Sequence, residues 1–218
     1  MRALISVFSA FLFFACTTDS YNKGEGRSSL LQANTAELTV NSEKEGVSFV
    51  TDDGDAYMLT KPLTAHWIQT ADTVYRAIIY YKEVADGMAA AQTVAQLTTI
   101  HPVPHWMFKQ LPQDPLDMES CWLSKGGKYL NMALLVKSGY VDDKEEKQTI
   151  GLAQDTVLLH ASQKRTACYR LLHRQNDVPQ YFTSRRYVCI ALPAGQLDTV
   201  RLAYPTLGGT VERTLVLK

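Results

Sequence analysis

Alternation of apolar and polar residues constrains the fold of this chain more than any other feature. From about residue 36 onward, short runs rich in β-branched and aromatic residues alternate with polar ones, and turn-forming residues interrupt them every 8 to 15 residues or so. The chain has 218 residues, of which 46% are hydrophobic and 20% charged, a composition typical of a folded protein. The sequence therefore predicts an all-β protein and excludes a disordered chain or a collagen-like fibre.

The first group of alternating runs predicts a small barrel over residues 35–101. Strands are expected at 36–40, 46–51, 56–59, 73–84 and 90–100. Asp53-Gly54 between two of them predicts a tight hairpin, because glycine accepts the positive φ that such a turn requires. Five strands with a long fourth one are typical of an OB-like barrel, in which residues 61–70 form a loop or a short helix.

A proline-rich segment predicts the boundary between two domains. Prolines 102, 104, 112 and 115 remove backbone donors and fix φ, so residues 102–117 are expected to be an irregular linker. Alternating runs then resume at 121–123, 129–136, 147–152, 156–161, 166–173, 185–192, 199–204 and 211–217. Seven or eight short strands in about 100 residues predict a β-sandwich over residues 118–218.

The N-terminal residues are typical of a secretory signal. Arg2 is followed by an uncharged, apolar run over residues 3–15, and then by Cys16. A transmembrane helix needs about 20 apolar residues, so the 13 present here favour a cleaved signal over a retained span. Residues 1–16 are therefore predicted to be a signal peptide that ends at Cys16.

The end of that signal resembles a bacterial lipobox. In Phe13-Phe14-Ala15-Cys16, Ala15 fits the small position before cleavage, although Phe13 stands where leucine is usual. The resemblance implies that the Cys16 thiol is diacylated, so that it carries palmitate-type chains, and that it becomes the mature N-terminus. Residues 17–34 are rich in small polar residues and predict a flexible tether. By analogy with known sorting rules, Thr17 after the cysteine favours a lipid anchor in the outer membrane, on either its periplasmic or its outer face.

Four further motifs resemble the NigD-like lipoproteins of Bacteroidota. They are Thr51-Asp52-Asp53-Gly54, Cys121-Trp122 with Lys128-Tyr129-Leu130-Asn131-Met132, Leu171-Leu172-His173-Arg174, and Thr199-Val200-Arg201-Leu202-Ala203-Tyr204. These are diffuse patterns that span nearly the whole chain. The resemblance implies an OB domain followed by a β-sandwich behind a lipidated cysteine. The family name comes from a bacteriocin gene cluster, for which an immunity role has been supposed, and no catalytic residues carry over.

Histidines and cysteines give no metal signature. His101 and His105 are close in sequence, but two prolines prevent the helix that would place them on one face. His160 and His173 fall in expected strands, where half-exposed imidazoles are common. Cys121, Cys168 and Cys189 allow one disulfide at most. We expect buried free thiols, and a Cys168–Cys189 disulfide between neighbouring strands is the alternative.

Most charged residues are expected to lie on the solvated surface. The carboxylate pairs at Asp52-Asp53, Asp142-Asp143 and Glu145-Glu146 lie in turn-like stretches. The 22 basic and 22 acidic residues give a net charge of zero, which argues against a nucleic-acid partner even for Tyr75, Tyr80 and Tyr81 in the barrel. A more basic region, formed by Lys164-Arg165, Arg170, Arg174 and Arg185-Arg186, is either a patch for an anionic partner or part of solvated strand faces.

We therefore expect a lipid-anchored envelope protein that acts as a non-enzymatic binding or protective module. This hypothesis assigns Cys16 as the lipidation site, with no catalytic residue, cofactor or metal, and with an envelope protein or glycan as partner. There is no nucleophile elbow and no phosphate-binding glycine loop. The alternative is a small envelope hydrolase or metal-dependent enzyme, which requires His66, Asp53 and His160 to converge.

Overall fold

A computed structural model describes residues 31–140, 147–193 and 195–217. Within these ranges the chain forms fourteen β-strands and one 3-10 turn (η1), so the predicted all-β class is confirmed. Residues Gln32–Lys218 form one compact unit. The signal peptide, Cys16 and most of the expected tether lie outside the described residues, as do Asp142-Asp143 and Glu145-Glu146.

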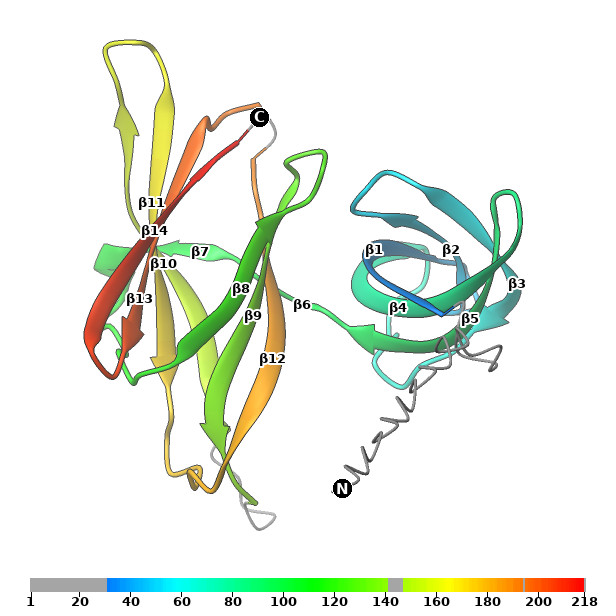
Figure 1. Ribbon diagram of the computed structural model, residues 1–218, viewed down its shortest axis with the longest axis horizontal. Helices are drawn as coiled ribbons and strands as arrows, with labels where there is room; N and C mark the ends of the chain where they lie inside the picture. Colours follow the sequence, from blue (N-terminus) through cyan, green and yellow to red (C-terminus); the bar gives the residue numbers. More distant parts are fainter. Residues whose placement is uncertain (1–30, 141–146, 194, 218) are drawn as a thin grey trace, which may run out of the picture. The chain divides into compact units, whose positions relative to one another are not determined.

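Five strands close into a barrel with the strand order β1-β2-β3-β5-β4 (Figure 1). Strand β1 closes it by pairing with both β2 and β4, and β5 pairs with β4 and, in parallel, with β3. Gly54 has a φ of 96°, as the predicted Asp-Gly turn requires. The strands are β1 (Gln32–Val40), β2 (Gly46–Thr51), β3 (Ala56–Leu63), β4 (Thr73–Ala85) and β5 (Met88–Gln96).

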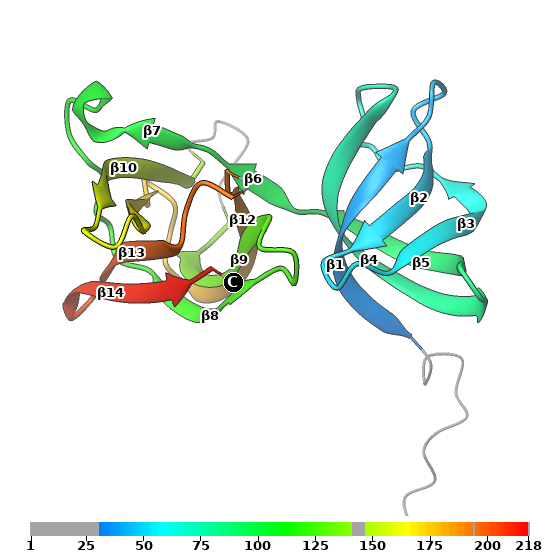
Figure 2. The ribbon, with the colours of Figure 1, turned by 90° about the horizontal axis from the view of Figure 1, so that it is seen from above.

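The remaining strands form a sandwich of two sheets, which Figure 2 shows as two layers. One sheet has the order β14-β13-β11-β10-β7 and the other the order β6-β12-β9-β8. The strands are β6 (Thr98–Ile100), β7 (Pro102–Pro104), β8 (Asp117–Leu123), β9 (Tyr129–Ser138), β10 (Thr149–Leu159), β11 (Arg165–Arg174), β12 (Phe182–Ala191), β13 (Thr199–Thr206) and β14 (Gly209–Val216). The turn η1 (His105–Met107) follows β7.

Two expectations about residues 90–117 are wrong. The single strand expected at 90–100 is divided into β5 and β6, and β6 pairs with β12 of the sandwich. The proline-rich stretch is not wholly irregular, because Pro102–Pro104 pairs in parallel with Leu152–Gln154. Proline is tolerated here because β7 is an edge strand, where a missing N–H can face away from the sheet.

Two further expectations about single elements are wrong. The strands expected at 147–152 and 156–161 are one strand, β10, whose register against β11 shifts between Gln154 and Thr156. Such a bulge interrupts the alternation without ending the strand, so the sequence pattern looks like two runs. At the other end of the chain, the first residues of β1, Gln32 to Asn34, belong to the barrel and not to the tether.

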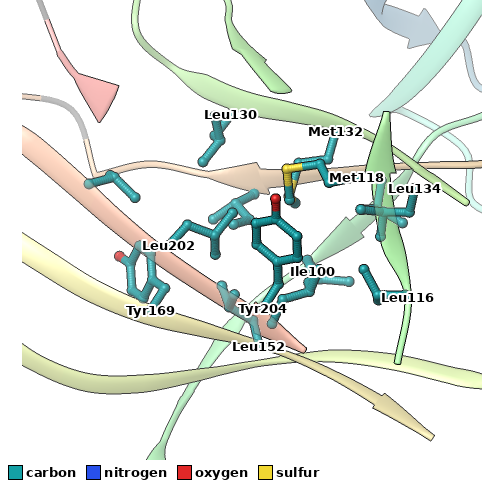
Figure 3. Close-up of a cluster of buried hydrophobic side chains, with 14 of the residues drawn as sticks. Ile100, Leu116, Met118, Leu130, Met132, Leu134, Leu152, Tyr169, Leu202 and Tyr204 are labelled. Carbon is teal, nitrogen blue, oxygen red and sulfur yellow. The ribbon is translucent and has the colours of Figure 1, made fainter. Parts of the chain in front are cut away.

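Each part has its own apolar core. In the sandwich, side chains of both sheets point toward one another (Figure 3), among them Leu130 and Met132 from β9 and Tyr169, Leu202 and Tyr204 from the facing sheet. In the barrel, alternate residues of β1 and β4 point inward and pack against Phe49 and Leu59. Tyr81 is one of these inward residues, and its ring contacts those of Phe49 and Tyr57.

Candidate functional site

A buried polar cluster joins the barrel to the outer face of the β6-β12-β9-β8 sheet. Along β9, the even-numbered residues such as Leu130 and Met132 enter the sandwich core, so Tyr129 and Asn131 face outward. Along β4, Ala77 and Ile79 fill the barrel, so Arg76 faces outward as well. Arg76 and Asn131 are nevertheless 7% and 1% exposed, because each side chain is covered by the other part of the molecule.

Asp52 is the centre of this cluster. Its carboxylate accepts two hydrogen bonds from the Arg76 guanidinium, at 2.7 and 3.0 Å. It also accepts hydrogen bonds from Asn131 Nδ2 and from Thr35 Oγ1, each at 2.6 Å. Arg76 Nη2 in turn donates to Asn131 Oδ1 at 3.1 Å. We call Thr35, Asp52, Arg76 and Asn131 the interdomain clamp, since they connect β1, β4 and the β2–β3 turn with β9.

Main-chain and aromatic contacts extend the clamp. The backbone N–H of Lys125, in the β8–β9 turn, donates to the carbonyl of Asp52 at 2.9 Å. The Arg76 guanidinium lies 3.9 Å from the centre of the Tyr129 ring, a distance typical of a cation–π contact. The two motifs that carried the family resemblance, Thr51-Asp52-Asp53-Gly54 and Lys128-Tyr129-Leu130-Asn131-Met132, therefore meet in space.

Glu37 on β1 makes a second connection beside the clamp. It accepts hydrogen bonds from Lys128 Nζ and from the Tyr129 hydroxyl, both at 2.5 Å. Burial tends to raise the pKa of Glu37, but the hydrogen bonds from Lys128 and Tyr129 outweigh it, so the pKa is lowered. Burial and the bond to Glu37 raise the pKa of Tyr129. Burial alone would lower the pKa of Arg76, and its bonds to Asp52 reverse this, so the clamp residue stays charged.

The lowered pKa of Glu37 predicts a pH-dependent loss of stability. Its stabilisation is fully present above the ordinary pKa of 4.5 and is lost as the pH falls through the lower folded value. We expect the difference in urea stability between the wild type and Glu37→Gln to shrink when the pH drops from about 7 to about 3. The exposed Glu43→Gln substitution controls for the loss of one negative charge. A difference that stays constant with pH would show that Glu37 is not coupled to folding.

The interpretation of Asp52-Asp53 as a solvated turn is wrong for Asp52. Asp53 is exposed, as expected. The Asp52 side chain, however, is only 12% exposed and forms the ion pair with Arg76. The local sequence offers no sign of this, because the partners of Asp52 lie 24 and 79 residues further along the chain.

A groove of about 360 Å³ lies beside the clamp, between the two parts. Aromatic rings line it from three strands: Tyr80 from β4, Trp122 from β8 and Tyr187 from β12. Tyr80 and Tyr187 are 36% and 37% exposed. Its polar lining comes from β1 and from the two turns that meet at the clamp, with Asn34, Asp53 and Lys125 among the residues. We call this the aromatic groove.

The three residues of the enzyme alternative do not converge. His66 lies in the segment after β3 and lines a different hollow, formed with Leu63 and Trp67. Asp53 lines the aromatic groove, and His160 lies in the β10–β11 turn, bonded to Thr166. Among the described residues, no group of three or more His, Cys, Asp or Glu side chains could hold a metal ion.

The other histidines contact main-chain carbonyl oxygens or lie at the surface. His105 contacts the carbonyl of Asp155, whereas His101 is exposed. His173 was expected to be half-exposed but is fully buried, and its Nδ1 must carry the proton because it faces two carbonyl oxygens, those of Asp114 and Pro115.

Cys121, Cys168 and Cys189 are free thiols. The suggestion that the strands carrying Cys168 and Cys189 are neighbours is wrong, because β11 and β12 belong to different sheets. Cys189 is fully buried, with Thr99 Oγ1 at 3.3 Å, and burial raises the pKa of Cys121 to about 11.

The basic residues do not form one patch. Arg165, Arg170 and Arg174 belong to β11, whereas Arg185 and Arg186 belong to β12 of the other sheet. Arg170 and Arg185 are ion-paired with Asp155 and Glu119. The interpretation as solvated strand faces therefore fits better than a single anion-binding surface.

Within the ranges that the structure describes, no helix is long and apolar enough to cross a membrane. Cys16, the one residue with a predicted chemical modification, precedes these ranges.

Solved structures with the same fold come from Bacteroidota. A NigD-like immunity protein from Bacteroides caccae superposes with a TM-score of 0.66 at 21% identity, over 86% of this chain and 97% of that one. A protein named as toxin-related, from Parabacteroides distasonis, gives 0.64 at 17% identity over 85% and 92%. A protein named as a lipoprotein, from Bacteroides fragilis, gives 0.56 at 14% identity over 86% and 98%.

No protein-family model matches the sequence, and no curated protein matches it. The likeness therefore rests on structure, and it extends over nearly the full length of each of these neighbours. The family resemblance inferred from the sequence is confirmed in the fold: this chain has the two-part, all-β fold of a NigD-like protein.

Proposed function

We propose that this protein is a lipid-anchored, non-enzymatic binding protein of the outer membrane, held there through Cys16. The observation that carries the proposal is the aromatic groove beside the interdomain clamp. Ligand sites favour domain interfaces and combine apolar walls with a few polar groups, as this groove does. The clamp fixes the two walls relative to each other, so ordering them on ligand binding costs little entropy.

The charges of the site favour binding over turnover. In the clamp, Asp52 is bonded to Arg76 and to Asn131, and beside it Glu37 is bonded to Lys128 and Tyr129. A general acid or base needs a proton-transfer group within reach of the substrate. The Asp52 and Glu37 carboxylates are already bonded, which leaves Asp53 as the one free carboxylate among the described residues that line the groove. A protective, immunity-like role at the envelope is one form such binding takes, and two neighbours with names related to immunity and toxins support it.

The anchor is tested by comparing the full chain with Cys16→Ala in cells. Two acyl chains give stable membrane attachment, so we expect palmitate label and an outer-membrane location for the wild type. The Cys16→Ala variant should lose the label completely and leave the membrane fraction. Intact mass should show the matching loss of the lipid, and Cys121→Ala serves as a control thiol substitution. A wild-type protein without label would overturn the anchor.

A further inference from the structure

We propose that the aromatic groove binds an uncharged saccharide. The inference rests on the proposed binding function and names the ligand class for that groove. It starts from an unusual placement: three aromatic side chains from strands of both parts line one hollow, and two of them remain more than a third exposed. Aromatic rings of this size are normally buried in a core or an interface.

The aromatic walls suit a ring with one apolar face. A pyranose ring presents C–H groups on its faces and hydroxyls around its edge. The faces of Tyr and Trp rings are electron-rich and attract the weakly positive hydrogens of such C–H groups. Tyr80, Trp122 and Tyr187 therefore provide surfaces for sugar faces, and the volume of about 360 Å³ lies within the usual range of ligand pockets.

The polar groups of the groove suit hydroxyls. Asp53 and Lys125 line it, both are exposed, and in the described structure the side chain of neither forms a hydrogen bond or an ion pair. A carboxylate accepts from hydroxyls and an ammonium donates to them, so the two together can bind groups that do both. Their opposite charges cancel, which disfavours a strongly anionic or cationic ligand.

A second hollow is lined in part by residues of the same two turns. That hollow, of about 330 Å³, is lined by Glu37, Lys128 and Tyr129. Its aromatic ring, that of Tyr129, already contacts the Arg76 guanidinium, and Glu37 is bonded to Lys128 and Tyr129, although Asp53 and Lys125 line this hollow as well. Asp53 and Lys125 are therefore shared by the two hollows, and the free aromatic rings of Tyr80, Trp122 and Tyr187 are what distinguishes the aromatic groove.

The test is calorimetric titration of the purified, lipidated full chain in detergent with hexasaccharides of glucose, mannose, xylose and galactose. We expect one of these neutral sugars to bind, and Tyr80→Ala and Tyr187→Ala each to weaken its binding at least tenfold. Trp106→Ala and Tyr181→Ala are the matched controls, because both rings are more exposed than those of the groove and lie outside it. Their affinity should equal that of the wild type.

Thermal unfolding of each variant separates lost binding from lost folding, and Tyr187→Phe keeps the ring for the case in which Tyr187→Ala unfolds. No binding of any hexasaccharide, or binding that the groove variants leave unchanged, would overturn the inference. So would preferential binding of an anionic polysaccharide, or of a peptide that occupies the same groove. In each of these cases the lipid anchor and envelope location, tested through Cys16, would stand independently.

Discussion

Replacing Asp52 by alanine should destabilise the protein by about 3–5 kcal/mol, because the substitution leaves a buried guanidinium without its counter-charge. The Arg76 side chain is 5% exposed, and its two hydrogen bonds to Asp52 are the ones that offset its burial. Asn131 and Thr35 would lose a partner at the same time. Urea unfolding measures the loss, which should appear as a lower midpoint.

Two further variants make this prediction specific. Asp53→Ala alters the neighbouring, exposed carboxylate and should change stability by less than about 0.5 kcal/mol. The double variant Asp52→Ala/Arg76→Met removes both charges, so it should be more stable than Asp52→Ala alone, with a coupling between the two sites. An Asp52→Ala protein as stable as Asp53→Ala would contradict the clamp.

A cavity at Phe49 in the barrel should lower the unfolding free energy about as much as the loss of the clamp does. Phe49 is 1% exposed, and its ring lies 5.2 Å from that of Tyr57 and 4.9 Å from that of Tyr81. Phe49→Ala removes these contacts and leaves a void, with an expected loss of about 3–5 kcal/mol in unfolding free energy. Urea unfolding followed by circular dichroism gives the value.

The neighbouring Val50 provides the control for that substitution. It lies on the same strand but is 41% exposed, so Val50→Ala should cost well under about 1 kcal/mol. Equal losses for Phe49→Ala and Val50→Ala would mean that the barrel is not packed around the Phe49 ring.

Local features of the sequence predicted the elements that depend on neighbouring residues. The hairpin at Asp53-Gly54 was predicted from its turn residues, and the bounds of β2 from alternation between two turns. The bulge in β10 and the pairing of Pro102–Pro104 were missed. Each depends on which strand lies alongside, and that information is not present in the residues themselves.

The candidate site depends even more on contacts between distant parts of the sequence. Asp52 and Asn131 were both named in the family motifs, but nothing between them in the sequence indicates that they touch. Arg76 is one polar position within the strand expected at 73–84, and an arginine flanked by apolar residues in a long strand is the one signal there of a buried ion pair. Tyr80 and Tyr187 were read as strand residues, because the groove exists only once three strands of two parts are assembled.

Photo-crosslinking in living cells from the aromatic groove tests the binding role of this groove. A benzophenone amino acid replaces Tyr187 in one strain and Trp106 in another, each in the otherwise unchanged full chain. We expect a crosslinked product from position 187, little or none from position 106, and loss of the product when Cys16→Ala is added to the first strain. Equal products from both positions, or none from position 187 in a stable protein, would contradict an envelope binding protein that acts through this groove.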